Sequence, residues 1–183
     1  MSITKVSDVQ IENLFISEIK KNKAGGEAAY LKYNDSSIIL QTDILNVVNY
    51  QDNAVELSIE GSKFLNLVTI FESFAETAFC KEDEEENCTL RSTLSENNTI
   101  KLNIIDGKTM MFDSKKNNID QLEIDTKVQI LVQPTGIWCK NNEYGVSFKL
   151  LQIKVLEKEE SLQDYSFVDD EENEYYDVIP NDF

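Results

Sequence analysis

Apolar and polar residues alternate with a period of two over much of this chain, which is the pattern of half-buried β-strands. In the first third, such runs are separated by turn-forming residues, including Gly25-Gly26 and Asn34-Asp35-Ser36. The runs predict four strands, at residues 14–20, 28–33, 37–42 and 55–59.

A single segment has the spacing of a helix. From residue 63 to 79 the apolar positions recur every three to four residues, and Ser62 stands where an N-cap is expected. The aromatic residues of this segment are expected to pack in the core. The positions that define the helical period are Phe64, Leu67, Val68, Phe71, Phe74, Ala75 and Ala78.

The alternating pattern returns after an acidic loop at residues 81–87. It predicts strands at residues 99–104, 108–112 and 127–132, with Asp106-Gly107 as a hairpin signal between the first two. Pro134 is expected to end the strand before it. Residues 137–139 then lead through a turn at 140–143 into a long return strand, 144–156.

Short, closely spaced strands with one helix between them favour a small barrel over a sandwich. The order fits a mainly β fold, namely a five-stranded antiparallel barrel of the oligonucleotide-binding (OB) type with one central α-helix. The segment after Asp106 would add an extra hairpin. We expect one folded domain at residues 1–156 and a disordered acidic tail at residues 157–183.

Charge is distributed unevenly along the chain. The chain has a net charge of −17, of which residues 157–183 carry −10 and the acidic loop at 81–87 carries −4. The rest of the body is therefore near neutral, at about −3. A near-neutral body can carry its lysines on one face, so the acidity does not argue against an anionic ligand.

The composition argues against enzymes, metal-binding proteins and proteins with a phosphate-binding loop. The chain has no histidine, which removes the commonest general base and metal ligand, and it has no Gly-rich phosphate loop. The three cysteines, Cys80, Cys88 and Cys139, are expected to be free thiols. We therefore expect no enzyme activity, no metal and no cofactor.

The sequence also bears on location. No run approaches the roughly 20 apolar residues of a membrane span, and the first residues do not resemble a signal peptide. The expected location is the cytoplasm, or a host nucleus or viral replication site, without membrane association.

Lysines interleaved with aromatic residues indicate a surface for single-stranded nucleic acid, because lysines neutralise phosphates and flat rings stack on bases. Candidate stacking residues are Tyr30, Phe112, Trp138 and Tyr144. Candidate phosphate contacts are Lys20, Lys21, Lys23, Lys32, Lys108, Lys115, Lys116, Lys140 and Lys149. Phe148 is instead in phase with Val146 and Leu150, which is typical of a core face.

The end of the acidic tail has a second candidate role. Its last seven residues, Asp177-Val178-Ile179-Pro180-Asn181-Asp182-Phe183, combine acids with an apolar tip. Asp177, Ile179, Asp182 and Phe183 are candidate partner-binding residues, and the tail as a polyanion is expected to compete with DNA for the cationic groove.

Two segments carry a resemblance to a known class of protein. The segment from Gly136-Ile137-Trp138-Cys139-Lys140 through Tyr144-Gly145-Val146-Ser147-Phe148-Lys149 to Gln152-Ile153-Lys154-Val155 resembles the last hairpin of single-stranded DNA-binding proteins of large eukaryotic DNA viruses. With the acidic tail, it is also similar to the single-stranded DNA-binding proteins of bacteriophage replisomes.

The resemblance implies sequence-independent binding of single-stranded DNA during replication, recombination or repair. It also implies recruitment of a polymerase, helicase or primase through the tail, and a homodimer.

Two alternatives remain open. An acidic chaperone or interaction protein that binds basic partners would use the same tail but needs no face of aromatic residues and lysines. A carboxylate-based, metal-dependent enzyme would instead need divalent metal for activity.

Overall fold

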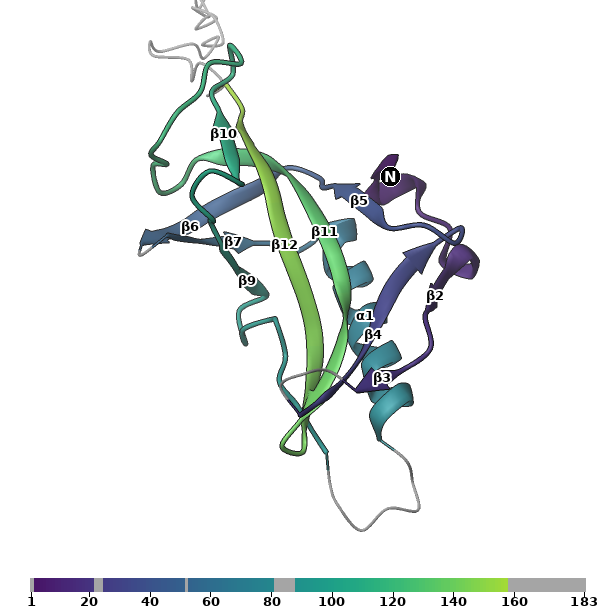
Figure 1. Cartoon of the computed structure of the whole chain (residues 1–183). Helices are drawn as coiled ribbons and strands as arrows, with labels where there is room; N and C mark the ends of the chain where they lie inside the picture. Colours follow the sequence, from purple (N-terminus) through teal and green to yellow (C-terminus); the bar gives the residue numbers. More distant parts are fainter. Residues whose placement is uncertain (1, 22–24, 52, 81–87, 158–183) are drawn as a thin grey trace, which may run out of the picture.

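The computed structural model describes residues 2–21, 25–51, 53–80 and 88–157, which form one mixed sheet, one α-helix and two short 3₁₀ helices, at Val6–Asp8 and Ile11–Asn13 (Figure 1). Twelve strands are present in the described residues. In chain order the elements are β1 (Ser2–Lys5), β2 (Leu14–Ile16), β3 (Lys20–Lys21), β4 (Glu27–Tyr33), β5 (Ile38–Gln41), β6 (Leu45–Gln51), β7 (Ala54–Ser58), α1 (Lys63–Phe79), β8 (Thr89–Leu90), β9 (Thr99–Asn103), β10 (Met110–Phe112), β11 (Lys127–Lys140) and β12 (Glu143–Val155).

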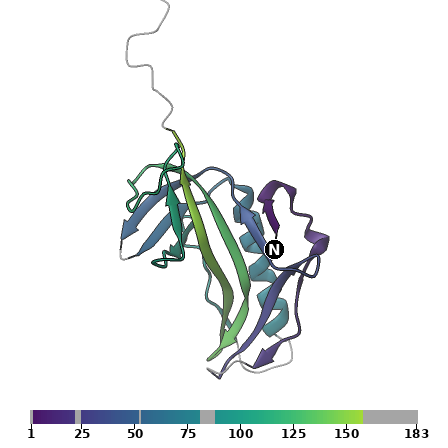
Figure 2. The same cartoon turned by 45° about the horizontal axis from the view of Figure 1, so that its top comes forward.

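The long strand β11 organises the sheet. Along one edge it pairs with three strands in turn, β6 near its start, β5 in the middle and β4 near its end. Along the other edge it pairs with β12 for its whole length. The two strands are joined at Asn141 and Asn142, which both have positive φ, as a two-residue type I′ hairpin requires. Figures 1 and 2 show this pair curving across the molecule.

Two irregularities in the β11–β12 register decide which side chains face the core. One lies between Leu131 and Val132, and the other lies between Pro134 and Gly136. An extra residue in one strand reverses the alternation of side chains beyond it. On β11 the buried positions are therefore even-numbered from Val128 to Pro134, whereas Ile137 is buried and Trp138 is only half-buried after the second bulge.

The core lies between this curved sheet and α1. Ser62 caps the helix, since its side-chain oxygen accepts a hydrogen bond of 3.2 Å from the Leu65 N–H. Phe64 and Phe71 on the helix are fully buried, and both rings contact Phe148 of β12 at centroid distances of 6.0 and 6.2 Å. The helix thus covers one face of the β11–β12 pair and leaves the opposite face without a helix over it (Figures 1 and 2).

The structure confirms some of the predicted elements and differs from others. The mainly β composition and the helix at Lys63–Phe79 with its Ser62 cap are confirmed. The sheet is open among the described residues, which is consistent with an OB-like fold, while closure into a five-stranded barrel stays a prediction. The sheet is also not purely antiparallel, since β1–β5, β8–β12 and β10–β12 are parallel pairs.

Two local predictions were wrong. No extra hairpin follows Asp106, because β9 pairs with β7 whereas β10 pairs with β12. Pro134 does not end its strand but lies at a bulge inside β11, where its missing N–H is tolerated. Strands β1, β6 and β8 were not predicted. The domain boundary at residue 156 stays a prediction, because residues 158–183 lie outside the described residues.

Within the described part of the chain, no helix has the length and apolar character needed to cross a membrane.

Gly136 offers a test of the bulge. A Cβ at this position would lie 2.3 Å from the carbonyl oxygen of Ala29 on the neighbouring strand β4. Because backbone has to move to relieve that clash, Gly136→Ala should lower the free energy of unfolding by about 1–3 kcal/mol. Denaturant unfolding monitored by circular dichroism measures the loss. Gln133→Ala, on the same strand, serves as the control and should stay within about 0.5 kcal/mol of the parent; an equal effect of both changes would contradict the clash.

Candidate nucleic-acid interface

The side of β4, β11 and β12 that faces away from α1 is called the open face here. Cross-strand pairs fix its rows, because directly opposed residues point to the same side of a sheet. Tyr30 of β4 is opposite Gly136, and Gly136 is opposite Ser147 of β12. In the next row Ala28 is opposite Trp138. Tyr30 and Trp138 are thus diagonal neighbours on one face.

Both aromatic side chains lie beside a glycine. Tyr30 is 70% exposed and faces Gly136 across the strand pair. Trp138 is half-buried and lies against Gly145, where an added Cβ would come within 3.0 Å of Trp138 Cζ2 and 2.8 Å of the Arg91 carbonyl oxygen. Gly145 leaves room for the Trp138 ring at the surface of the sheet, whereas Gly136 lets the backbone of β4 come close beside Tyr30. These two rings are therefore the best-placed candidates for stacking on bases.

Lysines surround the two rings. Lys20 of β3 is opposite Ala28, which places it in the row of Trp138. Lys32 is two residues beyond Tyr30 on the same side of β4, and Lys149 is opposite Gln133 of β11. Lys154 is opposite Gln129 further along. Four lysines thus lie along the open face.

Acidic residues are nearly absent from the same strands. From Lys127 to Val155 the sequence contains one acid, Glu143, against four lysines. The Glu143 carboxylate lies at the end of the hairpin, 3.7 Å from the Arg91 guanidinium, with both side chains more than half exposed. Within the described residues, Lys32, Lys149 and Lys154 have no carboxylate partner. The electrostatic character of the open face is therefore cationic, although the chain as a whole is acidic.

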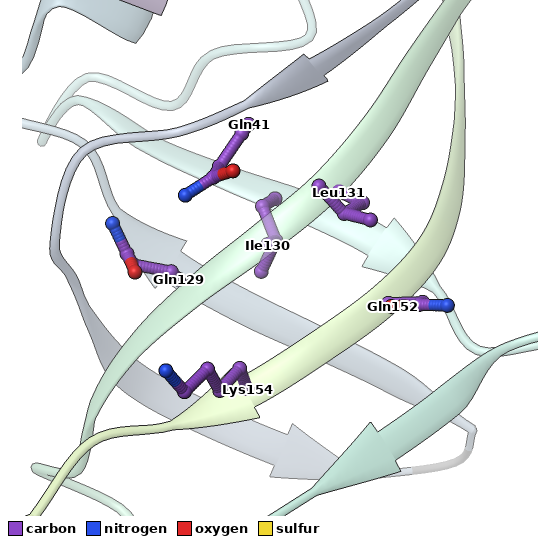
Figure 3. A pocket seen from close by; sticks show the side chains of 6 residues that line it. All are labelled: Gln41, Gln129, Ile130, Leu131, Gln152 and Lys154. Atoms are coloured by element: carbon purple, nitrogen blue, oxygen red, sulfur yellow. The ribbon is translucent and has the colours of Figure 1, made fainter. Parts of the chain in front are cut away.

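Two hollows lie on the open face. One, of about 380 Å³, is lined by Tyr30, Leu31, Lys32, Ser37, Gln133, Pro134 and Thr135. The other, of about 270 Å³, lies further along β11 and is lined by Gln41, Gln129, Ile130, Leu131, Gln152 and Lys154 (Figure 3). A strand of nucleic acid following β11 would cross both.

The third predicted cluster lies at the far end of β12. Phe112 of β10 is half-buried and opposite Lys154, which places it in the last row of the open face. Lys108 is exposed in the loop before β10, and Lys115 and Lys116 are exposed in the turn after it. The predicted residues therefore extend over the length of the strand pair, with Lys140 exposed at the opposite end.

The structure contradicts the prediction that Tyr144 stacks on a base. It was a candidate stacking residue, but it is 4% exposed and shares the core side of β12 with Val146 and Phe148. Burial raises the pKa of Tyr144 to about 12, and a hydrogen bond with the Cys80 thiol adds to the increase. Tyr144 is therefore not available to stack on a base.

Two of the candidate lysines near the N-terminus are not part of the open face as the structure describes it. Lys21 is opposite Glu27 and so points to the side away from Lys20 and the open face. Lys23 lies outside the described residues, as do the candidate partner-binding residues Asp177, Ile179, Asp182 and Phe183.

The sequence interpretation missed four side chains of the open face. Lys154, Gln41, Gln129 and Gln152 all line the second hollow. On β12 the alternation of side chains that includes Lys149 does not extend to Gln152 and Lys154, because the register with β11 shifts between Leu150 and Gln152. A change of phase after Leu150-Leu151 was the available signal.

The three cysteines are free and lie close together, although they are far apart in the sequence. Cys80 follows α1, Cys88 precedes β8, and Cys139 lies on β11 opposite Tyr144. Burial raises the pKa of the Cys80 and Cys139 thiols, and the neighbouring Cys88 thiol raises both further. Among the described residues, no group of three or more His, Cys, Asp or Glu side chains has the geometry to hold a metal ion.

The family model described as "Family of unknown function (DUF5871)" matches residues 17–169. The chain belongs to this family. A search of curated proteins found no match.

Among solved structures, the chain is similar to the "Single-stranded DNA-binding protein from bacteriophage Enc34, C-terminal truncation". The two share 10% sequence identity with a TM-score of 0.40, over 84% of this chain and 99% of the phage chain.

The clustered thiols and Tyr144 predict a loss of stability at alkaline pH. Their pKa values are raised in the folded state, so this contribution is fully present below the unfolded pKa of the thiols, about 8.5, and is lost as pH rises through the folded values. The melting temperature should therefore fall as the pH rises from about 8.5 towards about 12, the folded pKa of Tyr144. In the combined variant Cys80→Ala, Cys139→Ala, Tyr144→Phe the fall should be shallower than in the parent; an identical slope in both proteins would rule out these groups as its cause.

Proposed function

We propose that this protein binds single-stranded DNA along the open face, through base stacking on aromatic side chains and phosphate contacts to lysines. The observation that supports this most directly is the placement of Tyr30 and Trp138 on one face together with Lys20, Lys32, Lys149 and Lys154. Stacking is tolerant of sequence because every base has a flat face. The proposed role is binding without catalysis.

A single strand is the form of DNA that suits this surface. Stacking requires bases that are not already paired, so a duplex would offer the two rings only its phosphates. The rings of Tyr30 and Trp138 lie on adjacent strands of the sheet, and diagonal neighbours of this kind are about 7–8 Å apart. Successive unpaired bases could therefore contact them in turn, with lysines on both sides to meet the backbone.

Charge segregation supports the same proposal. The strand pair from Lys127 to Val155 has a net charge of +3, while residues 157–183 carry −10. A polyanion that follows β12 in the sequence would compete with DNA for the cationic face and discourage weak, nonspecific contacts. We propose that role for residues 157–183. Recruitment of replication enzymes through the tail, a homodimer, and a part in replication, recombination or repair stay predictions from the resemblance.

The two aromatic side chains can be tested one at a time. Tyr30→Ala and Trp138→Ala should each weaken binding to a fluorescent thymine oligonucleotide by about 5- to 150-fold, because one stacked base contributes about 1–3 kcal/mol. Fluorescence anisotropy at low salt measures the affinity. Trp138 is the sole tryptophan, so its intrinsic fluorescence should also be quenched by DNA in the parent protein.

Ile124→Ala removes an apolar side chain that is 58% exposed in the loop before β11 and lines neither hollow, and it should leave the affinity unchanged. If the parent protein shows no binding to the oligonucleotide even at low salt, the DNA-binding proposal fails. Binding of basic proteins in its place would then favour the acidic chaperone.

The phosphate contacts of the lysines should determine how steeply the binding constant falls with salt concentration. Each phosphate contact to single-stranded DNA adds about 0.7 to the slope of log K against log salt. Lys32→Gln and Lys149→Gln should therefore each reduce that slope by roughly this amount and lower the affinity at low salt. Lys101→Gln, an exposed lysine of β9, is the matched control. Equal slopes for all three variants and the parent would show that the open face does not contact phosphates.

A further inference from the structure

The second hollow of the open face differs in chemistry from the region around Tyr30. Its polar lining consists of three glutamine amides, from Gln41, Gln129 and Gln152, and the ammonium group of Lys154. Leu131 provides an apolar surface between them (Figure 3). Among the residues that the structure describes, no aromatic side chain lines this hollow. Hydrogen bonding, rather than stacking, is therefore what the hollow offers a ligand.

The strand register gathers these side chains from three strands. Leu131 of β11 is opposite Gln41 of β5 on one edge and opposite Gln152 of β12 on the other. Gln129 is opposite Lys154 in the adjacent row. All five side chains therefore belong to the open face, in line with the hollow that contains Tyr30.

The polar groups are largely free to bind a ligand. The Gln129 side chain uses one N–H in a 3.3 Å hydrogen bond to the Thr42 carbonyl oxygen, which leaves its own oxygen available as an acceptor. Within the described residues, the amides of Gln41 and Gln152 have no hydrogen-bond partner and Lys154 has no carboxylate partner. The hollow thus presents unused donors and acceptors side by side.

We infer that this hollow holds one unpaired base by its edge and so adds a base preference to binding that is otherwise tolerant of sequence. This inference rests on the proposed function. An amide can pair with the edge of any base, because it donates and accepts. The pairing edge of thymine presents two carbonyl oxygens on either side of an N–H, whereas that of adenine presents one amino group and one ring nitrogen. Lys154, which only donates, can therefore act together with the amides to match all three groups of thymine but only two of adenine.

The experiment compares thymine and adenine homopolymers of equal length, using the full chain. We expect the parent protein to bind the thymine oligonucleotide more tightly. Gln152→Leu and Lys154→Met should each reduce the ratio of the two affinities by about tenfold, in line with the discrimination of one polar contact to a base. Stacking within the adenine strand affects every protein variant equally, so it cancels when ratios are compared.

Matched controls separate loss of base reading from loss of charge or fold. Gln51→Leu, at the end of β6, and Lys101→Met, on β9, make the same chemical changes at exposed positions outside the hollow, and should leave the ratio unchanged. Thermal unfolding confirms that each variant is folded. Since Gln152 and Lys154 are tested separately, a folding defect in one leaves the other as the test.

The possible failures are distinguishable. If the parent binds both oligonucleotides and the ratio is the same in Gln152→Leu, Lys154→Met and the controls, base reading by this hollow is overturned and the DNA-binding proposal stands. If Lys154→Met weakens both oligonucleotides equally, Lys154 contacts phosphate only, and the inference is again overturned. If the parent binds neither, the proposed function itself fails.

Discussion

The backbone ladder between β11 and β12 is the interaction on which the rest of the structure depends. It runs from Val128 opposite Val155 to Lys140 opposite Glu143, and β11 uses its other edge to hold β6, β5 and β4. The same two strands contribute the core contacts to α1 on one side and most of the open face on the other. Any change in the register of this pair would therefore alter the core and the candidate site together.

The bulge at Pro134 and Gly136 shows how that coupling works. Without an extra residue there, Trp138 would have the same parity as Val128, Ile130 and Val132 and would point into the core. Proline lacks the N–H that a regular ladder would use, and Gly136 allows the backbone of Ala29 to come close. The residue types at the bulge thus determine that an indole, rather than an aliphatic side chain, reaches the surface beside Tyr30.

Sequence reasoning succeeded where the determining interactions are local. The helix was located with its cap because both the apolar period of residues 63–79 and the Ser62 hydrogen bond involve neighbours within one turn. Tyr30 and Lys32 share a face for the same reason, being two apart on one strand. Tyr144 could have been assigned to the core from its phase with Val146 and Phe148. The parallel pairing of β10 with β12 joins residues about forty positions apart, and no local pattern specifies it.

The two regions proposed on the open face would act through forces of different range. Lysine–phosphate attraction acts over several ångströms and is screened by salt, so it controls how strongly and how fast a strand is bound but carries no sequence information. Amide hydrogen bonds act only at contact and are specific to the groups on a base edge. In the proposed binding mode, Tyr30 and the lysines near it would supply the first kind of binding together with stacking. The glutamines beside Lys154 supply groups of the second kind, one hollow further along β11. A strand held by the first region would be positioned to have a base read by the second, since both belong to one rigid ladder.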